Sequence, residues 1–135
     1  MPALPWTQRQ PVDPGRTYLA MASRLPLRHR RTIPGFLRDA IAIRRQLALA
    51  GGMIGYALDA ELARRTFWTF SVWDDQASLD AFAASDPHQA ITRRLRPLMA
   101  QTRFEFFQVP GSDLPMTWDQ MKAPVRGQRS PDGAR

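Results

Sequence analysis

Residues 66–73 (TFWTFSVW) constrain the fold of this chain more than any other segment. Nearly all of them are aromatic, β-branched or small, which is the composition of a β-strand. Alternation along a strand places Phe67, Thr69, Ser71 and Trp73 on one face and Trp68, Phe70 and Val72 on the other. Both faces are therefore apolar, whereas a strand with one hydrated face alternates apolar and polar residues. We predict that helices cover one face and that the sheet of a second subunit covers the other.

The segments around this strand predict the order strand, helix, strand, strand, helix, strand. The other three strands are expected at residues 17–25, 53–58 and 103–109, which are short runs of strand length. This order is the ferredoxin-like βαββαβ pattern. It gives an α+β fold in which a four-stranded antiparallel sheet carries its helices on one face.

Turn and capping residues mark where the two helical regions begin and end. The first is expected to have Pro34 in its first turn and to end at the pair Gly51-Gly52. Asp74 or Asp75 is expected to cap the second region. That region breaks at Ser85, restarts at once, and is expected to kink or end at Pro97.

The two ends of the chain differ from its centre. Residues 1–16 and 110–135 hold four prolines each, and residues 1–16 show no apolar period. We expect a flexible N-terminal arm at 1–16, the ferredoxin-like domain at 17–109, and an extended C-terminal tail at 110–135. The tail is expected to be disordered past about Val125. Its segment 114–121 is apolar enough to lie on the domain or on a partner.

The composition excludes several kinds of site. The chain has no cysteine, which removes disulfides, thiolate nucleophiles and cysteine-based metal sites. With only two histidines, His29 and His88, we expect no metal site within the chain. No segment has the length and apolarity of a membrane span or a signal peptide, so we expect a cytoplasmic protein that does not bind membranes.

The net charge of +7 is concentrated near residues 24–31, where Arg24, Arg28, Arg30 and Arg31 lie. Nucleic-acid binding usually adds stacking aromatics or a docking helix to such charge, and here the aromatics lie in the strands. We therefore expect no nucleic-acid partner. A solvated loop is the simplest interpretation, and a loop that attracts an anionic substrate is the second.

His88 is the best single candidate for chemistry. His88, Ile91, Leu95 and Leu98 follow one another at helical spacing, so they form one inward-facing stripe. The imidazole lies at a helix start, where the partial positive charge disfavours a second charge, so we expect a neutral ring. Its neighbours Asp86 and Gln89 are expected to form a capping box, with Ser85 or Asp86 as the ring's hydrogen-bond partner. The alternative is a packed core histidine without catalytic function.

The aromatic strand supplies the candidate substrate-binding residues. The set is Trp73, Trp68, Phe70, Ser71, Thr69 and Phe82. The aromatic members suit an apolar cavity, and the two hydroxyl groups can orient a ligand inside it. The alternative for the aromatic residues is core and dimer packing.

Four segments together resemble a known family: Gly52–Leu58, Thr66–Asp74, Leu79–Phe82 and Ser85–His88. They resemble a bacterial family related to the antibiotic-biosynthesis monooxygenases, in particular the spheroidene monooxygenase type. The similarity covers about residues 17–109. It implies a homodimeric α+β barrel with a pocket between sheet and helices near Trp73 and His88. Some relatives oxidise polyaromatic substrates without metal or flavin, others bind haem through a histidine, and others are not oxygenases.

Three hypotheses follow for function. The first is a monooxygenase-like enzyme of secondary metabolism that acts on a small hydrophobic molecule, aromatic, polyketide-like or carotenoid-like, without a cofactor. His88 would be its base or hydrogen-bond donor. The second is a haem enzyme of the same fold with His88 as axial ligand. The third is a dimeric module that binds a metabolite without catalysis.

Overall fold

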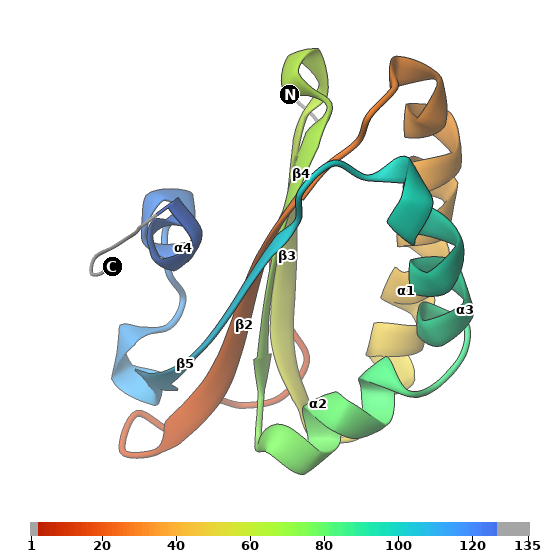
Figure 1. Ribbon diagram of the computed structural model, residues 1–135. Coiled ribbons are helices and arrows are strands. Elements are labelled where there is room, and N and C mark those ends of the chain that lie inside the picture. Colours follow the sequence, from red (N-terminus) through yellow and green to blue (C-terminus); the bar gives the residue numbers. More distant parts are fainter. Residues whose placement is uncertain (1–2, 127–135) are drawn as a thin grey trace.

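The computed structural model describes residues 3–126, which form one antiparallel sheet with helices on both faces (Figure 1). The strands are β1 (Ala3–Gln8), β2 (Thr17–Pro26), β3 (Met53–Glu61), β4 (Thr66–Trp73) and β5 (Arg103–Pro110), in the order β1-β3-β4-β2-β5. The helices are α1 (Ile33–Leu49), α2 (Gln76–Ala83), α3 (His88–Leu95) and α4 (Trp118–Arg126). Four short 3₁₀ turns, η1 (Arg30–Thr32), η2 (Leu62–Arg64), η3 (Arg96–Leu98) and η4 (Gly111–Asp113), join them.

The predicted ferredoxin-like core is confirmed. Helix α1 connects β2 to β3, β3 turns into β4, and α2 and α3 connect β4 to β5. Asp75 caps α2, because its side chain accepts a hydrogen bond from the Ser78 N–H at 2.8 Å. Helix α3 ends at Leu95 and passes into the turn η3 that contains Pro97, as expected for proline.

Helices α1, α2 and α3 cover one face of the sheet (Figure 1). Phe67 of β4 stacks on Phe36 of α1, with ring centroids 4.1 Å apart. Farther along β4, Trp73 is completely buried and lies 5.2 Å from the ring of Phe82 in α2. Two apolar clusters therefore close the two ends of this layer, and the space between them holds the site described below.

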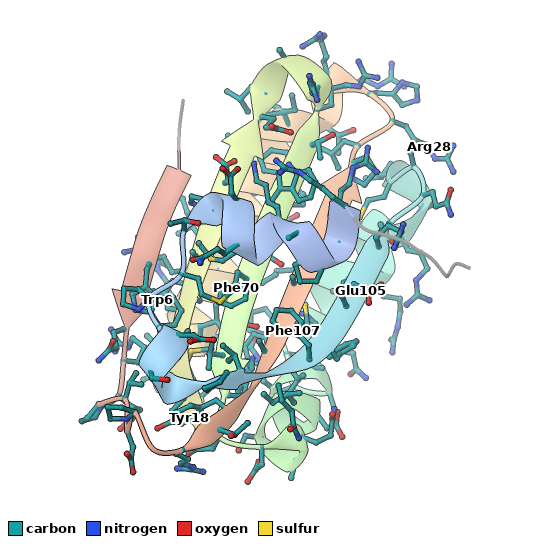
Figure 2. All side chains as sticks on the ribbon, turned by 90° about the vertical axis from the view of Figure 1, so that its left-hand side faces the viewer. Trp6, Tyr18, Arg28, Phe70, Glu105 and Phe107 are labelled. Atoms are coloured by element: carbon teal, nitrogen blue, oxygen red, sulfur yellow. The ribbon has the colours of Figure 1, made fainter. Side chains whose placement is uncertain are left out.

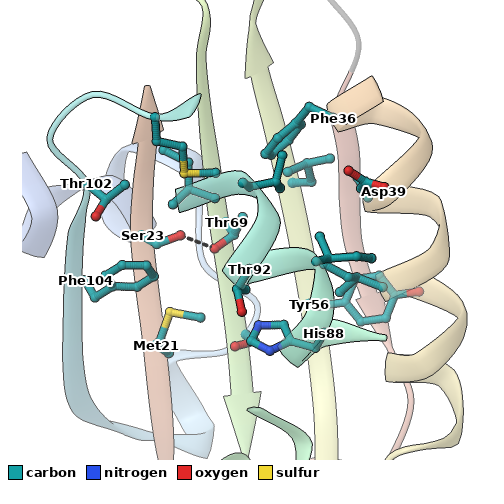
Figure 3. Close-up of a pocket in the computed structure, with 18 of the residues that line it drawn as sticks. Met21, Ser23, Phe36, Asp39, Tyr56, Thr69, His88, Thr92, Thr102 and Phe104 are labelled. Carbon is teal, nitrogen blue, oxygen red and sulfur yellow. Dashed lines mark hydrogen bonds between the residues drawn. The ribbon is translucent and has the colours of Figure 1, made fainter. Parts of the chain in front are cut away.

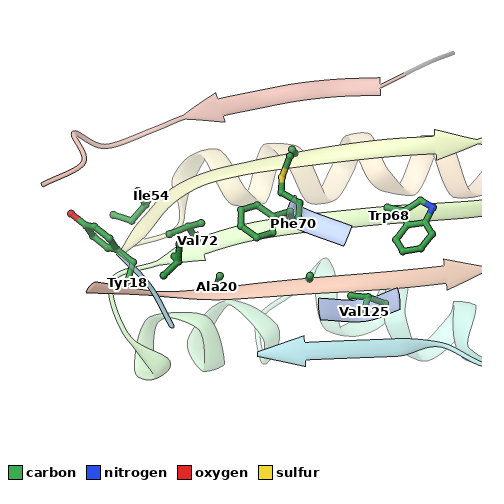
Figure 4. Packing of buried hydrophobic residues seen from close by; sticks show 11 residues of the cluster. Tyr18, Ala20, Ile54, Trp68, Phe70, Val72 and Val125 are labelled. Carbon is green, nitrogen blue, oxygen red and sulfur yellow. The ribbon is translucent and has the colours of Figure 1, made fainter. Parts of the chain in front are cut away.

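The opposite face of the sheet is covered by the chain's own C-terminal segment. Trp68, Phe70 and Val72 are buried there with Met121 and Val125 of α4 (Figure 4). Both faces of β4 are thus covered as predicted, but the expectation that a second subunit's sheet covers this one was wrong. Residues 114–121 do lie on the domain. A homodimer stays a prediction.

A buried lysine holds α4 on the sheet. Lys122 has a side chain only 7% exposed, and its Nζ lies 2.6 Å from the Asp59 carboxylate and 3.7 Å from that of Glu61, both on β3. The same ammonium lies 4.8 Å from the ring centroid of Trp68, whose indole N–H donates to Glu61 at 2.8 Å. Asp59 and Glu61 therefore keep a charged partner although α4 shields them from water.

The N-terminal segment adds a strand to the predicted four. Strand β1 pairs antiparallel with β3 at the sheet edge. Trp6 lies against Gly55, where a Cβ atom would overlap the indole ring, so glycine permits the close packing of β1 on β3. The disorder expected past Val125 falls almost wholly on residues 127–135, outside the described residues. Between residues 3 and 126, no helix is long and apolar enough to cross a membrane.

Candidate functional site

A cavity of about 510 Å³ lies between the sheet and the helices α1 and α3 (Figure 3). Strands β2, β3 and β4 form its floor, and segment 96–104 closes one side. Most of its wall is apolar, including Met21, Leu25, Phe36, Ile43, Leu47, Ile91, Leu95 and Phe104. Such a cavity favours a mainly hydrophobic ligand of moderate size.

His88 contributes its imidazole to this cavity from the first residue of α3 (Figure 3). The predicted stripe is confirmed, because Ile91 and Leu95 are buried and His88 and Leu98 are half-buried. The ring of Phe82 lies 4.9 Å from the imidazole and continues the aromatic contact to Trp73. His88 therefore lies at the junction of the cavity and the aromatic cluster of α2.

One hydrogen bond fixes the tautomer of His88. Its Nδ1 lies 3.2 Å from the carbonyl oxygen of Ala83, and a carbonyl can only accept, so Nδ1 carries the proton. In the neutral ring Nε2 is then a free acceptor, and within residues 3–126 it has no hydrogen-bond partner. The expected partners, Ser85 and Asp86, do not bind the ring. The arrangement suits proton abstraction inside the cavity.

Burial lowers the pKa of His88 below its ordinary value of 6.5, and the hydrogen bond to Ala83 partly offsets this shift. The neutral ring expected from the sequence is thus favoured, but the larger physical cause is desolvation. The predicted capping box does not form, because the Asp86 carboxylate accepts from the Ala90 N–H at 3.1 Å and not from Gln89.

Gln46 of α1 positions the start of α3. Its side-chain oxygen accepts from the His88 backbone N–H at 2.8 Å. Its amide group donates to the carbonyl oxygens of Phe82 and Ser85 at 3.3 and 3.4 Å. One side chain therefore joins the end of α2, the break, and the start of α3. Gln46 was not among the residues predicted from the sequence, because no local pattern marks a contact over 42 residues.

Hydroxyl groups on the sheet floor face the cavity. Ser23 of β2 and Thr69 of β4 are hydrogen-bonded to each other (Figure 3). The Ser71 hydroxyl accepts from the Trp73 indole N–H at 2.9 Å, which leaves its own proton available. The floor can therefore donate hydrogen bonds to an oxygen atom of a bound molecule.

An ion pair borders the same cavity. Asp39 of α1 is buried and accepts two hydrogen bonds from the Arg94 guanidinium of α3, at 2.9 and 3.1 Å. Nearby, Arg44 donates to the Tyr56 hydroxyl at 3.3 Å. These pairs tie α1 to α3 and to the sheet around the cavity.

The structure brings together only part of the predicted site. Thr69, Ser71, Phe82 and His88 line the cavity. Phe70 contributes to the floor, but its ring packs in the cluster under α4. Trp73 lies behind Ser71 and supports it through the indole hydrogen bond. Trp68 packs against Lys122 on the other face, so it is not a wall of this cavity.

Metal ligands do not gather in the part of the chain that the structure describes. Among residues 3–126 no group of three or more His, Asp or Glu side chains could hold an ion.

The fold has clear relatives among solved structures. Neither a protein-family sequence model nor a curated protein sequence matches the chain. A conserved protein from Methanosarcina mazei Go1 aligns with a TM-score of 0.62 at 17% identity, over 70% of this chain and 94% of that one. SnoaB, a cofactor-independent oxygenase from Streptomyces nogalater, aligns with a TM-score of 0.59 at 16% identity, over 73% and 98%. An antibiotic biosynthesis monooxygenase aligns with a TM-score of 0.58 at 14% identity, over 67% and 95%.

The chain has the fold of the antibiotic-biosynthesis monooxygenases. The resemblance noted in the sequence is thus confirmed at the level of the fold. Identities below one fifth do not carry a reaction from one protein to another, since one fold hosts many functions. The cavity and His88 are therefore the evidence that bears on function.

Proposed function

We propose that this chain is a monooxygenase-like enzyme that oxidises a small hydrophobic metabolite, aromatic, polyketide-like or carotenoid-like, in the cavity beside His88. The observation that carries the proposal is a free imidazole Nε2 in an apolar cavity of about 510 Å³. The fold shared with SnoaB, a cofactor-independent oxygenase, supports the same reaction class.

The first step is a proton transfer. His88 Nε2 accepts a proton from an acidic C–H or O–H group of the substrate, while Nδ1–H stays bonded to Ala83. The imidazolium that forms is partly shielded from water. Proton transfer therefore requires the acidic group of the substrate to lie close to Nε2. The Ser71 hydroxyl and the pair Ser23 and Thr69 stabilise the negative charge on a substrate oxygen.

The oxidation then uses the electrons of the substrate. The carbanion reacts with O₂, a C–O bond forms, and cleavage of the O–O bond leaves a carbonyl group and water. For a CH₂ group the balance is CH₂ plus O₂ to C=O plus H₂O, so the substrate supplies all four electrons. The apolar wall keeps bulk water from the carbanion, which would otherwise be reprotonated.

The proposal includes a homodimer. Phe104 and Phe106 lie on the edge strand β5 and are 51% and 54% exposed, although they are large apolar side chains. A second copy that covers them would remove this apolar surface from water and extend the wall that Phe104 gives to the cavity. The mass in solution tests this part of the proposal independently of activity.

An absorption spectrum and oxygen uptake test the proposed reaction. The proteins compared are wild type, His88→Gln and the control Gln89→Ala, which changes an exposed site on the same helix. Each is measured with a panel of phenols and polycyclic ketones. We expect uptake of O₂ by wild type and Gln89→Ala, and a loss of about 100-fold or more in His88→Gln.

Other results would contradict the proposal. A Soret band that disappears in His88→Gln would make His88 a haem ligand. Binding of the panel compounds without oxygen uptake would make the chain a binding module. Unchanged turnover in His88→Gln would remove the imidazole from the reaction.

A further inference from the structure

A second cavity, of about 320 Å³, lies on the other face of the sheet and is lined by arginines. Its wall consists of Arg24, Trp68, Gln101, Arg103, Val125 and Arg126. The three guanidinium groups come from three different elements, β2, β5 and the end of α4. Figure 2 shows this face, with α4 crossing the sheet.

Two of these arginines are direct cross-strand neighbours. Arg24 and Arg103 are register partners in the β2–β5 ladder. Like charges directly opposite each other in a sheet are destabilising. Arg126 adds a third positive charge to the same cavity, and its guanidinium carbon lies 5.8 Å from the ring centroid of Trp68. The fold therefore concentrates repulsive charges at one place.

The chain neutralises this charge only weakly. Arg103 lies 3.5 Å from Glu105, and both side chains are 41% exposed. Arg126 lies 3.7 Å from Asp119, whose side chain is 93% exposed. Arg24 has no ion pair within the part of the chain from residue 3 to residue 126. Exposed ion pairs of this kind are weak, so most of the positive charge of the three arginines stays available to a ligand.

We propose that Arg24, Arg103 and Arg126 form a binding site for a phosphate group, separate from the cavity of His88. Guanidinium groups bind phosphate oxygens through paired N–H donors, and the amide of Gln101 adds a further donor. The bound dianion offsets the repulsion between Arg24 and Arg103. The cavity has room beyond the phosphate itself, so the group can be a free ion or the end of a small phosphomonoester.

Gln101 borders both cavities, since it also lies in the wall of the His88 site. An occupied phosphate site would thus hold residues 99–102 in place, which belong to the segment 96–104 that closes one side of the His88 cavity. The proposal does not depend on the reaction at His88, and His88→Gln should leave phosphate binding unchanged.

Calorimetry and thermal unfolding of the full chain test the site, with inorganic phosphate and phenyl phosphate at constant ionic strength set by chloride. The variants are Arg24→Gln and Arg103→Gln, and the control is Arg28→Gln, an exposed arginine outside the cavity with the same change of charge. We expect phosphate to raise the melting temperature of wild type. Each cavity variant should weaken binding about tenfold or more, and Arg28→Gln less than about twofold.

Three results would overturn the proposal. The first is an unchanged melting temperature of wild type in phosphate. The second is a loss of phosphate affinity in Arg28→Gln equal to that in the cavity variants. The third is binding of an oligonucleotide without binding of inorganic phosphate or phenyl phosphate. Tighter binding of phenyl phosphate than of inorganic phosphate would support the end of a larger molecule, and the reverse would support the free ion. Should Arg24→Gln fail to fold, Arg126→Gln at the end of α4 gives the same comparison.

Discussion

Removal of the Lys122 ammonium is predicted to detach α4 from the sheet. In Lys122→Ala the carboxylates of Asp59 and Glu61 lose their cationic partner, but α4 still limits their contact with water. Breaking a fully buried ion pair costs about 3–5 kcal/mol. The two carboxylate side chains are 17% and 29% exposed, so part of their hydration remains, and we expect a loss of about 2–3 kcal/mol in the free energy of unfolding. For a chain of this length that corresponds to a melting temperature lower by about 10 °C.

The measurement is urea unfolding followed by circular dichroism. Asp119→Ala is the matched control, because Asp119 lies on the same helix with a side chain 93% exposed, and it should cost less than about 0.5 kcal/mol. In a double-mutant cycle, Asp59→Asn should cost much less in the Lys122→Ala background than in wild type. A Lys122→Ala variant as stable as wild type would show that this ion pair does not hold α4 on the sheet.

Further predictions concern the surroundings of His88 and the sheet edge. The folded-state pKa of His88 lies below its unfolded value of 6.5, so the unfolded chain binds more protons near that pH. The free energy of unfolding of wild type should therefore fall from pH 7 to pH 5. In His88→Gln it should fall less. In Gln46→Leu the His88 N–H and two carbonyls lose their partner, so urea unfolding should show a loss of about 1–3 kcal/mol. Gly55→Val should displace the Trp6 indole, seen as a red shift of tryptophan emission, and cost about 1–3 kcal/mol.

The sequence predicted the core elements because each has a strong local signal. The strand at Thr66–Trp73, the cap at Asp75 and the stop at Pro97 all depend on neighbouring residues. Helix α4 has no such signal, since Pro124 lies within it and lowers its intrinsic helix propensity. Burial of Met121 and Val125 against the sheet stabilises it instead. Proline content therefore predicted a tail where the structure has a packed helix.

Residue spacing predicted only those parts of the candidate site that depend on positions within one helix or one strand. The spacing placed His88 on the inward stripe, and strand alternation placed Thr69 and Ser71 beside it. The contacts that define the chemistry are not local. Gln46 reaches His88 across 42 residues, and Asp39 is buried because Arg94, 55 residues later, pairs with it. Trp68 was assigned to the pocket because alternation alone does not tell which face of β4 the helices cover.

The protonation state of the His88 ring decides whether this residue can act as a base in the cavity. Nitrogen-15 NMR of the wild-type imidazole, assigned by comparison with His88→Gln and titrated from pH 8 to pH 4.5, reports both the tautomer and the pKa. We predict a ring with the proton on Nδ1, a free Nε2, and a pKa below 6.5, since Ala83 accepts from Nδ1 and burial disfavours the charge. A proton on Nε2 in the neutral ring, or a pKa at or above 6.5, would contradict the account of His88 as a base in an apolar cavity.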